Sequence, residues 1–243
     1  AADFVFGWHR AVDPATASEY SYMLSDIGQI VNAAEIIAGE KPVTDLGITA
    51  VDDKTLKVEL NVPVSYFLSL MYFPTFYPVN EAFYNSCADT FGTSPDTVLS
   101  NGAFKLTDYQ PAATAFTLEK NPDYYDADKI ALDSLAYQVI KDSQQALMSY
   151  QTGALDMTLL NGEQVDQVKD DPEFTSVGAG YLWYLSPNMA GVPELANENL
   201  RKAITFALDR DSITDDVLKD GSAPCYTAVP PQFATGPDGS DFS

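Results

Sequence analysis

Residues that carry acid–base or nucleophilic chemistry are few and scattered in this chain. His9 is the single histidine and lies between Trp8 and Arg10. Neither a Gly-x-Ser-x-Gly nor a His-Glu-x-x-His pattern accompanies it, so we interpret it as a packing or surface residue rather than a catalytic base. Cys87 and Cys225 lack the spacing of a zinc motif, and we expect both to be unpaired thiols. We therefore predict that the protein is not an enzyme.

Patterns for cofactor and metal binding fail as well. Residues 178–180 (GAG) lack the third glycine of a dinucleotide fingerprint, and aromatic residues follow them instead of a helix start. Asp123, Asp126 and Asp128 lack the glycine and the distal glutamate of a calcium-binding loop. Acidic residues abound, so a glycosidase-type carboxylate pair stays open, but no local feature singles out two of them. We predict no cofactor and no metal site.

The charge balance excludes further classes of protein. The 243 residues contain 13 Lys and Arg against 35 Asp and Glu, a formal net charge of −22, and 46% are hydrophobic. A field this negative repels phosphate backbones, so we exclude nucleic acid as a partner. Apolar runs are too short to span a bilayer. We interpret the dispersed acids as a solvated surface, with a cationic ligand or a saline habitat as the alternative.

Hydrophobic spacing predicts mixed α and β structure. Helices are expected at 4–10 with Asp3 as the cap, 26–38 closed by Gly39, 63–71, 145–150 between Asp142 and Gly153, and near 163–170, 197–209 and 211–219. Strands are expected in a hairpin over 46–60, and at 101–106, 114–119, 135–140, 155–157 and 181–185. The strand–helix–strand order around 135–157 is typical of a parallel α/β sheet.

Aromatic side chains are abundant, with 14 Tyr and 13 Phe. Tyrosine offers a flat apolar face and a hydroxyl, which suits a cleft that encloses a polar organic ligand. For any single tyrosine, however, ordinary packing is the more frequent explanation.

Nine segments are informative together because of their order along essentially the whole chain. They are residues 2–10 (ADFVFGWHR), 13–18 (DPATAS), 45–50 (DLGITA), 52–56 (DDKTL), 63–67 (PVSYF), 100–106 (SNGAFKL), 119–125 (EKNPDYY), 150–158 (YQTGALDMT) and 200–210 (LRKAITFALDR). In this order the sequence resembles the oligopeptide/dipeptide-binding family of ABC-importer extracytoplasmic solute-binding proteins, and the resemblance rests on all nine segments rather than on any one of them.

The resemblance implies a periplasmic-binding-protein-like α/β fold, with two lobes that close on a ligand and an extra small domain. Family members are longer, so this chain is expected to be a fragment that lacks N-terminal and C-terminal parts. Residues 1–78 would belong to the small domain, 79–182 to the first lobe, and 183–243 to the beginning of the second lobe.

The same resemblance implies a function and a set of ligand-binding residues. The protein would capture peptides between its lobes and deliver them to the membrane permease of an ABC transporter. Tyr20 matches a tyrosine of the small domain that lines the cleft, and Tyr181 and Trp183 fall where the chain crosses between lobes. Directly after residues 156–158, related peptide binders have Tyr-Asn. This chain has Leu159 and Leu160 there, followed by Asn161, and the resemblance places Leu159 and Asn161 in the site. This departure admits other ligands, such as glycans or metal chelates.

The resemblance also implies partners and location. A monomer outside the cytoplasm is expected, in the periplasm or on the outer face of the cell membrane, held by a lipid anchor outside this fragment. The partners would be a peptide or other small solute and the transmembrane subunits of the permease. A sensor or enzyme built on the same lobes is the remaining alternative. Because half of the cleft would be missing, we expect residues 1–243 to bind ligand weakly or not at all.

Overall fold

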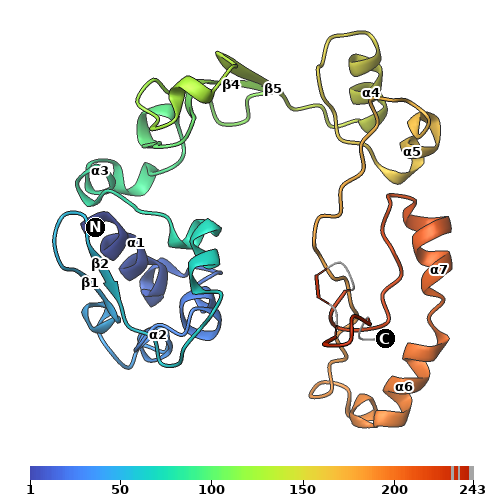
Figure 1. The fold of residues 1–243 in the computed structure, drawn as a ribbon, viewed down its shortest axis with the longest axis horizontal. Helices are drawn as coiled ribbons and strands as arrows, with labels where there is room; N and C mark the ends of the chain where they lie inside the picture. Colours follow the sequence, from blue (N-terminus) through green and yellow to red (C-terminus); the bar gives the residue numbers. More distant parts are fainter. Residues whose placement is uncertain (231–232, 235, 241–243) are drawn as a thin grey trace. The chain divides into compact units, whose positions relative to one another are not determined.

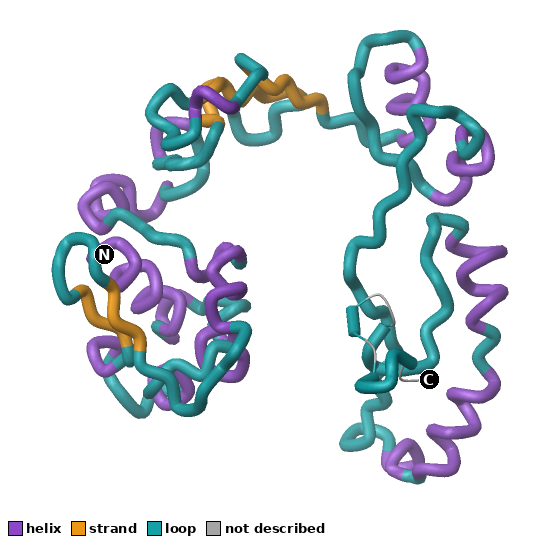
Figure 2. The backbone as a smooth tube through the Cα atoms, in the orientation of Figure 1, coloured by secondary structure: helices purple, strands orange, loops and turns teal. Residues whose placement is uncertain are grey.

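The chain divides by its contacts into two units, Ala1–Val139 and Ile140–Ser243, which are described separately. The structure is a computed structural model that describes residues 1–230, 233–234 and 236–240. Helices and strands are mixed in it (Figures 1 and 2), as the sequence predicts.

The first unit is built from short elements joined by tight turns. Its α-helices are α1 (Ala2–Val12), α2 (Ala33–Ile37) and α3 (Glu81–Cys87). Its strands are β1 (Ile48–Ala50), β2 (Leu56–Val58), β3 (Phe104–Asp108), β4 (Ala115–Lys120) and β5 (Ser134–Gln138). The 3-10 helices are η1 (Pro14–Thr16), η3 (Val43–Asp45), η4 (Phe67–Tyr72), η5 (Pro74–Phe76), η6 (Ala88–Thr90), η7 (Pro95–Thr97) and η8 (Ala127–Lys129), and η2 (Met23–Ile27) is a π-helix.

Trp8 anchors the hydrophobic core of the first unit. Its indole N–H donates to the carbonyl of Phe76 at 3.0 Å, and the two rings meet edge to face at 5.3 Å. Gly7 allows the backbone to approach this closely, because a Cβ there would lie 2.9 Å from the carbonyl oxygen of Tyr77. The buried apolar residues around this contact are Trp8, Val12, Leu24, Ile30, Ala33, Ile36, Leu46, Ile48 and Phe76.

Two of the predicted helix boundaries at the start of the chain need correction. The cap residue of α1 is Ala1, and Asp3 lies within the first turn, where its charge complements the helix dipole. The helix expected over 26–38 is interrupted, because Val31 N–H donates to the carbonyl of Glu59 at 3.0 Å and Ile30 forms a β-bridge with Leu60. Tertiary pairing with the second strand of the hairpin thus overrides helical spacing here.

The helix predicted from Pro63 begins later and is tighter than expected. Only Phe67–Tyr72 is helical, as the 3-10 helix η4, and a second 3-10 turn follows from Pro74. Pro74 accounts for the end of η4, because the residue before a proline is driven to extended angles, and Phe73 has a ψ of 133°.

The sheets are antiparallel. The hairpin of β1 and β2 pairs Ile48 with Val58, as the sequence predicts. The second sheet has the order β3-β4-β5 and aligns Leu106, Leu118 and Leu135 across its strands. The parallel sheet expected from residues 135–157 is wrong for the described residues, because 155–157 form no strand and β5 pairs antiparallel with β4 instead.

The second unit is helical in the residues described. It contains α4 (Ser143–Gln151), α5 (Gly162–Val168), α6 (Glu198–Ala207), α7 (Arg210–Ser212), the 3-10 helix η9 (Pro193–Ala196) and the π-helix η10 (Ile213–Leu218). The predicted ends of α4 are confirmed: the Asp142 carboxylate accepts from the Gln145 N–H at 2.7 Å, and Gly153 takes a positive φ of 76°.

Two strands predicted in the second unit do not form. Residues 155–157 and 181–185 are extended or irregular, and the described part of this unit contains no strand to pair with them. Alternating side chains make a strand only where another strand satisfies the backbone groups. Among the described residues, no helix is long and apolar enough to cross a membrane.

Candidate ligand-binding site

Tyr20, the predicted ligand residue of the first unit, lies in an exposed aromatic cluster. Its side chain is 49% exposed, and its ring meets Phe73 edge to face at 5.1 Å and Tyr22 at 6.1 Å. Phe73 packs against the hydrophobic core and thereby connects the aromatic cluster to it. The arrangement presents a fixed aromatic face and a hydroxyl without a hydrogen-bond partner in the described residues.

Leu159 and Asn161, the predicted ligand residues at the start of α5, differ in whether their side chains already have partners in the protein. Leu159 is 86% exposed. The Asn161 carboxamide caps α5: its oxygen accepts from Gln164 N–H at 3.2 Å, and its nitrogen donates to Ser143 Oγ at 3.0 Å. The buried Gln164 side chain donates in turn to the Ser143 carbonyl at 2.7 Å. The side chain of Asn161 therefore caps α5 and connects it to the start of α4, a structural role in addition to the predicted ligand binding.

Tyr181 and Trp183 lie two residues apart in an extended segment. Both side chains are exposed, Trp183 to 86%. Alternate residues of an extended chain project to the same side, so the two rings share one face of the segment. Tyr181, Trp183, Leu159 and Asn161 belong to the second unit and Tyr20 to the first. Their common role in binding stays a prediction.

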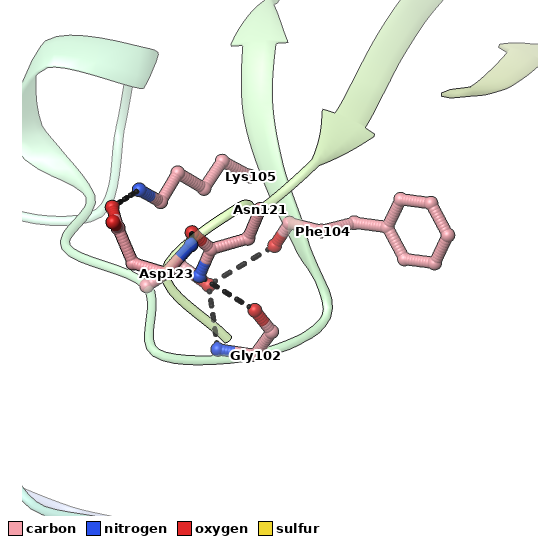
Figure 3. A network of polar contacts seen from close by, with 6 residues as sticks. Gly102, Phe104, Lys105, Asn121 and Asp123 are labelled. Atoms are coloured by element: carbon pink, nitrogen blue, oxygen red, sulfur yellow. Dashed lines mark hydrogen bonds and ion pairs between the residues drawn. The ribbon is translucent and has the colours of Figure 1, made fainter. Parts of the chain in front are cut away.

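The motifs around residues 102 and 121 form a polar network in the first unit (Figure 3). The Asn121 amide donates to the Gly102 carbonyl at 2.8 Å, and its oxygen accepts from the Asp123 N–H at 3.0 Å. Lys105 forms an ion pair with Asp123 at 3.0 Å. Asn121 is only 2% exposed. These motif residues join the start of β3 to the end of β4.

Two open polar hollows in the second unit were not predicted from the sequence. One, of about 440 Å³, is lined by Asp166, Thr214, Asp215, Lys219, Gly221 and Ser222. The other, of about 430 Å³, is lined by Tyr150, Gln151, Leu155, Asp156, Asp171 and Glu173. Both are assembled from side chains of distant segments, which no local pattern in the sequence reveals.

Titratable groups are perturbed in a few places. Burial lowers the pKa of His9 below its usual 6.5, and its Nε2 is buried without a hydrogen-bond partner in the described residues. The Tyr150 hydroxyl donates to the Glu173 carboxylate, which raises the pKa of that tyrosine. Lys169 beside Asp166 lowers the pKa of the carboxyl group.

The residues that a metal or a redox centre would use are dispersed. Within residues 1–230, 233–234 and 236–240, no three His, Cys, Asp or Glu side chains form a cluster that could hold a metal ion. Asp123 and Asp126, whose spacing does not fit a calcium loop, form ion pairs with Lys105 and Lys129. Cys87 and Cys225 are free thiols that hydrogen-bond to nearby backbone carbonyls.

The fold and the exposed aromatic groups fit a part of a periplasmic-binding-protein-like α/β protein, and comparison with known proteins gives the family. The model of the bacterial extracellular solute-binding proteins, family 5, matches residues 1–242, so the chain belongs to that family. The expected extracytoplasmic location is confirmed by this membership.

Individual relatives support the assignment. The dipeptide-binding protein DppE of Bacillus subtilis is 33% identical over 243 residues, which is 100% of this chain and 43% of the relative. The probable deoxycholate-binding periplasmic protein YgiS of Escherichia coli is 33% identical over 234 residues, 96% of this chain and 43% of the relative. The solved structure of the pheromone receptor PrgZ, described with its mode of peptide binding, matches with a TM-score of 0.80 and 33% identity, over 91% of this chain and 44% of PrgZ. The chain thus spans less than half the length of these relatives.

Proposed function

We propose that this chain is the part of an ABC-importer solute-binding protein that helps to capture peptides between two lobes for delivery to a membrane permease. The observation that carries the proposal is the family match over residues 1–242, together with relatives named for dipeptide and peptide binding. Residues 1–78 are assigned to the small extra domain, 79–182 to the first lobe and 183–243 to the second.

Binding of this kind needs no covalent chemistry and no cofactor. A ligand that contacts both lobes stabilises the closed arrangement by its differential affinity for it, and the closed form is the one that docks on the permease. Tyr20, Tyr181 and Trp183 supply aromatic faces for peptide side chains, because each is exposed rather than committed to a core. We infer that the protein acts as a monomer outside the cytoplasm, in the periplasm or held at the outer face of the membrane by a lipid anchor, and not as an enzyme.

A non-peptide solute is the second candidate. It is favoured by one relative, which is named as a probable deoxycholate-binding protein, and by the exposed apolar Leu159 at the position where a peptide binder is expected to have polar contacts. A rigid amphipathic molecule would gain more from Leu159 than from backbone hydrogen bonds.

Calorimetry on the full-length protein tests the peptide proposal. Tri- to pentapeptides are titrated into the wild type and into Tyr20→Ala and Trp183→Ala variants. Tyr125→Ala is the control, since Tyr125 is as exposed as Trp183 and lies outside the proposed site. We expect Tyr20→Ala and Trp183→Ala each to weaken binding by about 1–2 kcal/mol, roughly 5- to 30-fold. Equal affinities in all four proteins would remove these residues from the site, and no binding of any peptide would contradict the function.

A further inference from the structure

The dipeptide Asn-Gly occurs twice in the chain, at residues 101–102 and 161–162. In this dipeptide the asparagine side chain is especially open to attack by the following backbone nitrogen, because glycine has no Cβ to shield that nitrogen and permits many backbone angles. Both asparagines are exposed to solvent. The two sites therefore differ mainly in how the folded protein restrains them.

At the first site the groups that would react are unrestrained. Among the described residues, the Asn101 side chain has no hydrogen-bond partner, and the Gly102 N–H has one acceptor, Ser100 Oγ, at 3.3 Å. A Cβ at Gly102 would lie 3.6 Å from the same oxygen, and apart from the adjoining residues no other described atom lies within 4 Å of that position. The Gly102 nitrogen and the Asn101 side chain are thus able to approach each other.

The second site carries the same dipeptide in a restrained form. The Asn161 oxygen accepts from the Gln164 N–H at 3.2 Å, and the Asn161 amide donates to Ser143 Oγ at 3.0 Å. These bonds hold the carboxamide at the cap of α5, of which Gly162 is the first residue. The carbonyl of Leu218 packs directly against Gly162. Ring closure at Asn161 would break both side-chain hydrogen bonds and displace the first residue of the helix.

We infer that Asn101 is a site of spontaneous deamidation in the folded protein and that Asn161 is protected from the same reaction. The Gly102 nitrogen loses its proton to solvent and bonds to Cγ of Asn101, while the Cγ–Nδ2 bond breaks and ammonia leaves with a proton taken from solvent. One water molecule then opens the cyclic imide. Cleavage between Cγ and the Gly102 nitrogen gives aspartate, and cleavage between the backbone carbonyl carbon and that nitrogen gives isoaspartate. The inference does not depend on which solute is bound.

The isoaspartate product would act on the polar network shown in Figure 3. It routes the main chain through the former side chain and so adds one methylene group between residues 101 and 102. The Gly102 carbonyl accepts from the buried Asn121 amide at 2.8 Å. A longer backbone displaces this carbonyl, and a buried donor without an acceptor is costly. The modification thus loosens the junction of β3 and β4 through the backbone.

Peptide mapping by mass spectrometry on the full-length protein tests the inference. The protein is incubated in neutral and in mildly alkaline buffer, and aspartate and isoaspartate are quantified at positions 101 and 161. We expect Asn101 to convert at least ~10-fold faster than Asn161, because Asn161 must first give up two hydrogen bonds. Conversion should be faster in the alkaline buffer, since the attacking nitrogen must lose its proton. In urea, where neither site is restrained, the two rates should be similar.

Two variants separate the reaction from its consequences. Gly102→Ala places its methyl group in open space, so it should fold normally while shielding the nitrogen and slowing conversion of Asn101. Asn101→Asp carries the charge of the product on a normal backbone and should unfold in urea like the wild type, whereas the isolated isoaspartate form should unfold at lower urea concentration. Equal conversion at both sites in the folded protein, or conversion of Asn101 in urea only, would overturn the inference. An isoaspartate form as stable as Asn101→Asp would overturn the effect on the network.

Discussion

The side chain of Asn121 makes two hydrogen bonds to the backbone of the first unit. It is buried and joins Gly102 to Asp123, so its removal leaves a carbonyl and an N–H without partners. We expect Asn121→Ala to lower the free energy of unfolding by about 2 kcal/mol. Asn101→Ala is the matched control, because Asn101 is exposed and its side chain makes no hydrogen bond in the described residues. Urea unfolding measures both, and equal effects would show that the network carries no stability.

His9 makes the first unit sensitive to pH. Its folded pKa lies below the usual 6.5, so the unfolded chain takes up the proton first as the pH falls. Stability is therefore fully present above this value and is lost as the pH falls below it. The carboxyl groups with lowered pKa, such as Asp52 and Asp209, act in the same direction but below 3.8.

Urea unfolding measured between about pH 5 and pH 8 separates the contribution of His9 to stability from that of the carboxyl groups, which titrate at lower pH. We expect the wild type to lose stability toward pH 5 and His9→Phe to lose distinctly less over the same interval. Parallel pH profiles for the two proteins would show that His9 is accessible to water and to protons in the folded state.

At the scale of the elements, α5 packs against the end of η10 through Gly162. Adding one methyl group at this glycine tests the contact. A Cβ on Gly162 would overlap the carbonyl oxygen of Leu218, so Gly162→Ala must separate the two segments. We expect a loss of about 2 kcal/mol in the second unit. Gly178→Ala is the control, since nothing lies within 4 Å of its Cβ position. Thermal unfolding that does not distinguish the two variants would contradict this packing.

The sequence predicts elements well where the signal is local, and less well where it depends on a distant partner. Asp142 and Gly153 mark the ends of α4 because a cap and a positive φ are local properties. The break in the helix over 26–38 depends on Glu59 and Leu60, and the strand predicted at 181–185 does not form because the described part of the second unit contains no strand to pair with it. Tyr20, Tyr181 and Trp183 are predicted from the resemblance to the family, and their role in binding stays a prediction. The capping of α5 by Asn161 through Gln164 N–H is local, whereas the contact of Asn161 with Ser143, eighteen residues away, has no local signal in the sequence.

At the scale of the whole molecule, charge sets the response to salt. The net charge of −22 resists compaction, and the ion pairs of the described chain involve exposed side chains that contribute little. Raising NaCl from about 20 mM to about 500 mM shortens the screening length from about 20 Å to about 4 Å. We expect the unfolding temperature to rise by several degrees, equally in NaCl and KCl. A falling midpoint would show that attractive pairs outweigh the repulsion.

The central claim concerns what the complete protein carries. The full-length protein is purified without added ligand and denatured, and the released small molecules are identified by mass spectrometry. A peptide-binding member of this family should release a mixture of short peptides, because backbone contacts tolerate varied side chains. Recovery of one uniform non-peptide compound would contradict the peptide assignment and favour the second candidate.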